Sequence, residues 1–105
     1  MKQRSIPRGS VEYIEAVIET ADDPASATVQ LAVTAAGGTH SWLSAGWVAD
    51  AVFDTARQVW IRTARTTSVV TLSTANYPAS TYTVFAKVTL GAEAAIAPCW
   101  ELRIA

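Results

Sequence analysis

The residues of this chain that could do chemistry are few, and the single histidine comes first among them. His40 has Ser41, Ser44 and Asp50 near it in the sequence, so a Ser-His-Asp hydrolytic set is conceivable. Such a triad is defined by geometry and an oxyanion hole, and the chain contains no Gly-x-Ser-x-Gly nucleophile elbow. The favoured interpretation is therefore a loop histidine exposed to water.

The single cysteine, Cys99, limits redox and metal chemistry in the same way. One thiol cannot form an internal disulfide, and together with one histidine it cannot complete a tetrahedral zinc site. A small apolar role on a strand is the usual one for such a residue. Four aspartates also lack the alternating spacing of a calcium loop, namely Asp22, Asp23, Asp50 and Asp54. We expect no catalytic residue, no cofactor and no metal.

Length and composition predict one folded domain. The chain has 105 residues, half of them apolar and only 16% charged, which favours packed strands over a disordered segment. Its net charge of -1 gives no overall attraction for nucleic acid or an anionic membrane, so neither is expected as a partner. The opening residues lack the apolar stretch of a secretion signal, and we expect synthesis and use without Sec export.

Charge is distributed unevenly at the N-terminal end. Lys2, Arg4 and Arg8 make residues 1–9 a basic arm, and an acidic run follows that contains Glu12, Glu15, Glu19, Asp22 and Asp23. The arm could be held by its own domain or by a neighbouring subunit. The acidic run is slightly favoured as a solvated face, because exposed ion pairs contribute little, with docking of a neighbour's arm as the alternative.

Apolar residues recur with a period of two along most of the remaining chain. In residues 82–88, Tyr82, Val84, Ala86 and Val88 share one face, as in a strand with one buried side. Residues 40–53 are the least regular part, and residues 10–20 also fit a short helix, although their β-branched content favours a strand. Strands are predicted at 10–20, 27–34, 57–64, 68–72, 82–90 and 98–104.

Four tryptophans are a large number for so small a core. Trp60 shares a face with Arg62, opposite Val59 and Ile61, which makes it the best candidate for an exposed interface aromatic. Trp42 and Trp47 fall in the irregular region and could cap one end of a sandwich, whereas Trp100 is expected in the core. Partner binding is accordingly assigned to Lys2, Arg4, Arg8, Trp42, Trp47, Trp60 and Arg62.

The segment Pro78-Ala79-Ser80-Thr81-Tyr82-Thr83-Val84 resembles the tyrosine corner of immunoglobulin-like and fibronectin-type sandwiches. In that motif a tyrosine near the start of a strand bonds back to the preceding turn. Ala79 replaces the glycine often found there, and the inter-sheet cysteine pair is absent. The resemblance implies an architecture and no activity.

The wider layout is similar to a family of small sandwich proteins encoded among the virion structural genes of tailed phages of actinobacteria. The matching points are Ile6-Pro7-Arg8-Gly9-Ser10-Val11-Glu12-Tyr13, Ala27-Thr28-Val29-Gln30-Leu31-Ala32, Trp42, Gly46-Trp47, Tyr82-Thr83-Val84-Phe85-Ala86-Lys87-Val88 and Trp100-Glu101-Leu102-Arg103-Ile104. This resemblance covers nearly the whole chain through loose strand patterns. It implies a non-enzymatic part of the head or the head-to-tail junction.

Together these observations predict an all-β, immunoglobulin-like antiparallel β-sandwich of about seven strands, at residues 10–105, with an extended N-terminal arm at residues 1–9. The expected function is that of a capsid decoration or cement subunit. It would be made in the host cytoplasm, reside in the virion, and bind the major capsid protein or other virion proteins within a homo-oligomeric or otherwise symmetric assembly. Two alternatives stay open: a head-to-tail connector or tail component, and a carbohydrate-binding or adhesion module.

Overall fold

The computed structural model describes residues 3–7, 9–21, 23–24, 26–72, 77–78 and 80–104. This part of the chain contains strands and no helix. The strands are β1 (Gln3–Ile6), β2 (Val11–Glu12), β3 (Glu15–Thr20), β4 (Thr28–Ala35), β5 (Leu43–Trp47), β6 (Val52–Asp54), β7 (Val59–Thr66), β8 (Val70–Thr71), β9 (Ser80–Leu90) and β10 (Glu93–Ile104).

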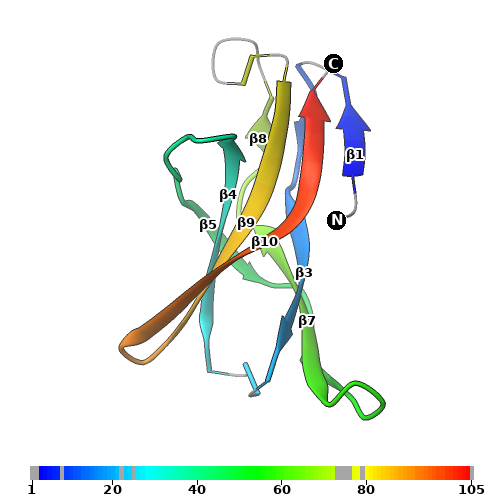
Figure 1. Cartoon of the computed structure of the whole chain (residues 1–105), viewed down its shortest axis with the longest axis vertical. Helices are drawn as coiled ribbons and strands as arrows, with labels where there is room; N and C mark the ends of the chain where they lie inside the picture. Colours follow the sequence, from blue (N-terminus) through cyan, green and yellow to red (C-terminus); the bar gives the residue numbers. More distant parts are fainter. Residues whose placement is uncertain are drawn as a thin grey trace.

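The strands form one curled, mixed sheet whose two halves face each other. Its order is β1-β10-β9-β4-β5-β7-β3, with β6 paired to β7, and β2 and β8 make a separate two-stranded ribbon (Figure 1). The curl occurs at β5, which pairs with β4 through Leu43 and Ser44 and with β7 through Ala45, Gly46 and Trp47. One half contains β1, β10, β9 and β4, and the other contains β7, β3 and β6. The predicted all-β, sandwich-like fold is confirmed.

The core lies between the two halves and follows the alternation in the sequence. Leu31 on β4, Val84 on β9 and Leu102 on β10 are fully buried, and Ala16 and Ile18 of β3 pack from the opposite half. Because side chains on a strand alternate between its faces, every second residue of these strands contributes to one apolar layer. The period-two pattern therefore identified the core residues of the long strands.

The tyrosine corner expected from the turn before β9 is present. The hydroxyl of Tyr82 donates a hydrogen bond of 2.6 Å to the carbonyl oxygen of Pro78, four residues earlier. The Tyr82 ring is buried in the core and meets Tyr77 edge to face. The bond satisfies a buried hydroxyl and attaches the turn to the sheet.

The N-terminal segment is held by its own domain. Gln3–Ile6 forms a parallel strand against β10, in which Gln3 pairs with Glu101 and Ile6 with Ile104. Ile6 is buried in the core, so β1 is an integral part of the sheet and makes it mixed. Lys2 and Arg8, the other basic residues of the predicted arm, lie outside the described residues.

Three other boundaries differ from the sequence-based prediction. Residues 10–20 form two strands, because Ile14 turns into the core between them, where its N–H donates to Thr66 Oγ1 at 3.1 Å. The irregular region 40–53 contains strands β5 and β6, which the scattered apolar residues concealed. The last strand begins at Glu93, because β9 supplies backbone partners along the whole alanine-rich stretch.

Candidate functional site

The structure separates the tryptophans that were predicted to bind a partner. Trp47 lies on the inner side of the curl, Trp60 at one end of β7, and Trp42 in the loop before β5. Each has its own set of contacts within the chain. The three rings therefore form no common binding platform.

Trp47 and Arg62 form an internal stack. The Trp47 indole N–H donates to the carbonyl oxygen of Ala27 at 2.8 Å, and the Arg62 guanidinium lies 4.7 Å from the centre of the Trp47 ring. Arg62 also donates through Nε to the Ala49 carbonyl at 2.8 Å and through Nη1 to the Pro24 carbonyl at 3.2 Å. These contacts attach two loops to the sheet, so the structure gives both residues a role in packing.

Trp60 was expected to be exposed, but its side chain is half-buried. Its ring lies 5.1 Å from that of Phe53, its direct cross-strand neighbour on β6. Aromatic pairs at this distance stabilise adjacent strands, so much of the Trp60 surface already has a partner.

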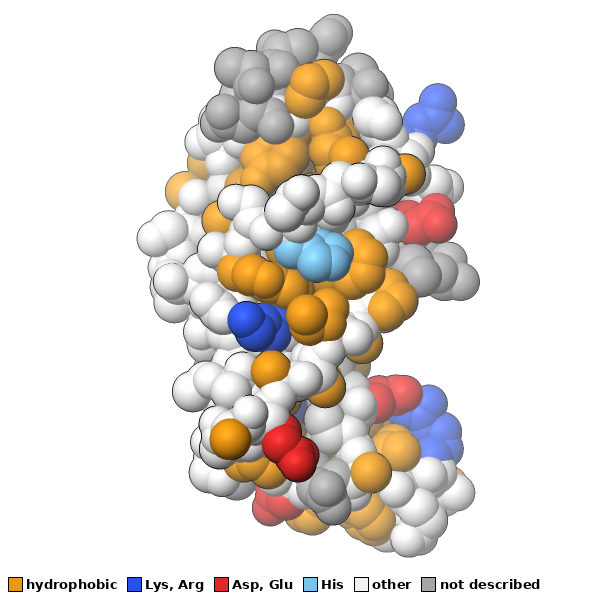
Figure 2. All heavy atoms as spheres, turned by 60° about the vertical axis from the view of Figure 1, so that its left-hand side comes forward, with side chains coloured by type: hydrophobic (Ala, Val, Ile, Leu, Met, Phe, Trp, Pro, Cys, Tyr) orange, Lys and Arg blue, Asp and Glu red, His pale blue; other side chains and the backbone are white. Residues whose placement is uncertain are grey.

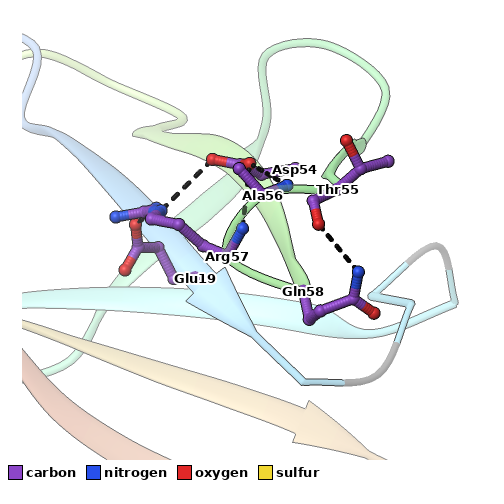
Figure 3. Close-up of polar contacts among 6 residues, drawn as sticks. All are labelled: Glu19, Asp54, Thr55, Ala56, Arg57 and Gln58. Carbon is purple, nitrogen blue, oxygen red and sulfur yellow. Dashed lines mark hydrogen bonds and ion pairs between the residues drawn. The ribbon is translucent and has the colours of Figure 1, made fainter.

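Figure 3 shows the polar contacts of the turn that joins β6 and β7, the two strands that carry this aromatic pair. Asp54 Oδ1 accepts hydrogen bonds from the backbone N–H groups of Ala56 at 3.0 Å and Arg57 at 3.2 Å. Gln58 has a positive φ of 57° and donates through Nε2 to the carbonyl of Thr55 at 2.7 Å. An aspartate before the turn and a residue in the left-handed region within it are typical of tight turns.

Trp42 belongs to an aromatic cluster on the outer face of the β4–β9 sheet. His40 lies 5.2 Å from Trp42 and 4.4 Å from Phe85 between ring centres, and Lys87 Nζ lies 5.6 Å from the Trp42 ring. Figure 2 shows the single histidine among hydrophobic side chains on this face. The prediction of a water-exposed His40 is corrected, because the ring is half-buried and its Nδ1 is 2.8 Å from Thr34 Oγ1.

Arginines of the same chain pair with the three glutamates of the acidic run. Arg4 lies 3.0 Å from Glu12, Arg65 lies 2.6 Å from Glu15, and Arg57 bridges Glu19 and Asp54. All of these side chains are substantially exposed, so each pair is worth little energetically. Arg4 and the acidic run are thus partners within one molecule, as on a solvated face.

Trp100 connects the two halves of the sheet. Its indole N–H donates to the backbone carbonyl of Glu15 on β3 at 2.8 Å, while its ring is half-buried against the core. The expected core location is thus correct in part. Cys99 beside it lies at a β-bulge and is also half-buried, and burial raises the pKa of its thiol.

An apolar groove opens below Trp100, where the two halves of the sheet separate. In Figure 1 the lower parts of β9 and β10 diverge from β3 and β7. The groove has a volume of about 740 Å³ and is bordered by β3 residues such as Val17 and by the β9–β10 hairpin. On the hairpin its lining includes Ala86, Val88, Leu90, Ala95 and Ala97.

The bulge at Cys99 explains why small side chains line this groove. After the bulge Trp100 pairs with Val84, and before it Ala97 pairs with Ala86. The β10 side chains that point inward are therefore the even-numbered residues from Trp100 onward and the odd-numbered residues up to Ala97. Large inward residues therefore fill the upper half, and alanines leave space in the lower half. Sequence reasoning missed the groove, and its local signal is the alanine-rich stretch 92–97, in which four of six residues are alanine.

Two strand edges border the groove. Among the described residues β1 pairs with β10 only at Glu101–Ile104, which leaves residues 93–98 paired on one side alone, to β9. Strand β3 is the last strand at the other end of the sheet and, within the described part of the chain, pairs with β7 alone. Unpaired strand edges present rows of backbone donors and acceptors to an incoming chain.

No group of three or more metal-binding side chains is found among the residues whose positions are described. In the same part of the chain, no helix has the length and apolarity needed to cross a bilayer. Comparisons of the chain with protein-family models, curated proteins and solved structures gave no match.

Proposed function

We propose that this chain is a non-enzymatic structural protein of a tailed-phage virion. In this role it is a head-associated decoration or cement subunit that binds the major capsid protein or another virion protein through its surface. The resemblance of its strand layout to small virion sandwich proteins supports the family. The observation that carries the binding role is the apolar groove between β3 and the β9–β10 hairpin, bordered by two strand edges that have no strand partner among the described residues.

A groove of this kind supports binding better than catalysis. Its lining is mainly apolar, and the single histidine lies elsewhere, in the aromatic cluster on the outer face of the sheet. Exposed apolar surface on a small domain is typical of sites where another protein docks. Because β1 is part of the sheet, the basic N-terminal segment would support assembly mainly by completing the domain.

The decoration role is tested in the phage or prophage that encodes the chain. Deletion of the gene should yield intact heads that lack this protein, and purified protein should bind back to them in a sedimentation assay. Mass spectrometry of wild-type virions should detect the chain, and its absence there would refute the proposal. Tailless heads after deletion, with a ring of copies at the portal axis, would indicate the connector alternative instead.

A carbohydrate-binding module is the second candidate, from a different functional class. The aromatic cluster supports it, because Trp42 lies beside His40 and Lys87 on the outer face of the sheet, where a sugar could stack. A glycan array with the wild-type protein and the Trp42→Ala variant tests this candidate. Binding that disappears in the variant would favour it, and an array without signal would exclude the glycans tested.

A further inference from the structure

We propose that the groove binds an extended, apolar and basic segment of another protein, which adds as a strand to the free part of β10. This inference deepens the proposed function, on which it rests for the presence of a second protein. It specifies the conformation and charge of the segment that would be bound. Strand addition of this kind obtains affinity from backbone hydrogen bonds and specificity from alternate side chains.

The same edge of β10 already accepts a strand in its upper half. β1 pairs with Glu101–Ile104 in parallel register, and its first residue, Gln3, pairs with Glu101. Residues 93–98 continue this edge for about 20 Å at the usual rise per residue. An incoming strand there would pair with the same edge of β10 that β1 uses at Glu101–Ile104. It would extend a pairing that the fold already uses within the chain.

The groove beside this edge has room for the side chains of such a strand. Ala95 and Ala97 on β10, with Ala86 on β9, form a shallow surface of small side chains. Leu90 is 45% exposed and Val17 on the opposite β3 edge is 61% exposed, so apolar surface on both sides lacks cover. Every second side chain of an added strand would point into this space.

Charge determines which segments fit. The charged side chains that line the groove are Glu19, Asp23 and Glu93, and none of its described lining residues is basic. Arg57 pairs with Glu19, whereas Glu93 lies on the hairpin side of the groove and is the acidic side chain beside the free part of β10. A segment with Lys or Arg near its ends complements this lining, whereas a second copy of the groove would bring like charges together.

The proposal is tested with the full-length protein and a random library of displayed peptides of about ten residues, long enough to span residues 93–98 with flanking positions at both ends. We expect the selected peptides to alternate apolar with polar residues and to carry net positive charge. When a selected peptide is bound, hydrogen exchange should slow by about tenfold at those amides of residues 94–97 that do not already bond to β9. An empty selection, acidic or non-alternating peptides, or protection confined to another surface would overturn it.

Two substitutions distinguish peptide binding in the groove from binding on the opposite face of the hairpin. Ala95→Arg places a bulky cation in the groove and should weaken peptide binding by at least about tenfold. Thr89→Arg adds the same charge on β9 between Val88 and Leu90 but on the other face of the strand; Thr89 does not line the groove, and binding should be unchanged. If Ala95→Arg fails to fold by circular dichroism, Glu93→Lys serves the same purpose, because it reverses the charge at the groove.

The outcomes also distinguish this inference from the proposed function. Virion association that persists in a folded Ala95→Arg protein would reject the groove and leave the virion role intact. Peptide binding by a protein that is absent from virions would reject the virion role and leave the groove intact. A concentration-dependent dimer that Ala95→Arg abolishes, measured by analytical ultracentrifugation, would show a second copy as the occupant and overturn the proposal.

Discussion

The indole N–H of Trp100 on β10 donates a 2.8 Å hydrogen bond to the backbone carbonyl of Glu15 on β3. Trp100 follows Cys99, which lines the groove, so this bond joins β10 to β3 next to the groove.

Replacing Trp100 by Phe should loosen this junction. The ring is retained in part, but the Glu15 carbonyl loses its donor, and we expect the free energy of unfolding to fall by about 1 kcal/mol. Urea denaturation followed by circular dichroism measures the change. Trp42→Phe is the matched control on the outer face. An equal loss in both variants would mean that ring volume, not the hydrogen bond, decides the effect.

The Tyr82→Phe variant tests the tyrosine corner. It removes the hydroxyl that donates to the Pro78 carbonyl while keeping the buried ring, so a loss of about 1–2 kcal/mol in unfolding free energy is expected. Tyr13→Phe changes the hydroxyl of a ring that is 48% exposed and should change stability by less than about 0.5 kcal/mol. Wild-type stability in Tyr82→Phe would contradict a structural role for the bond.

Thr66→Val should destabilise the bend between β2 and β3. Thr66 is 2% exposed, and its Oγ1 accepts from the Ile14 N–H, so the isosteric valine leaves a buried donor without its acceptor. The expected loss is about 1–3 kcal/mol in thermal or urea unfolding. Thr63→Val on the opposite face of β7 is the control and should be nearly neutral. The prediction fails if the two variants behave alike.

Arg62→Lys should not preserve the internal stack. Lysine cannot donate to the Ala49 and Pro24 carbonyls from one planar group while lying over the Trp47 ring. We expect a loss of about 1–2 kcal/mol in unfolding free energy. A parallel Arg57→Lys change affects an exposed ion-pair site and should cost less than about 1 kcal/mol. Full stability of Arg62→Lys would show that the charge alone suffices.

The Cys99 thiol should react slowly in the folded protein. Burial raises its pKa above the ordinary value, partly offset by a backbone hydrogen bond with Ala86, so the folded state holds this proton more tightly than the unfolded state. The raised pKa of Cys99 leaves the free energy of unfolding unchanged at pH values well below the pKa of the unfolded thiol. The free energy of unfolding then decreases as the pH rises through that pKa toward the higher pKa of the folded state. Alkylation by iodoacetamide near about pH 8.5 should accelerate on unfolding in urea. Equal rates would contradict the shift.

The sequence alone determined the fold class and most of the core. Alternation along residues 82–88, 29–33 and 100–104 places one set of apolar side chains on one face, so Val29, Leu31 and Val33 were expected in the same layer as Val84 and Leu102. The turn before Tyr82 could also be predicted, because the Tyr82 hydroxyl bonds to the Pro78 carbonyl only four residues away. Features that depend on residues close together in the sequence can be predicted from the sequence alone.

The tertiary structure alone decided which surfaces are available to a partner. Trp47 and Arg62 look like interface residues in the sequence, yet they meet across β5 and β7 and hold two loops. The groove exists because a bulge at Cys99 changes the facing of β10 and because β1 covers only its upper half. Pairing between strands far apart in sequence sets both features, and no local pattern encodes which edges remain open.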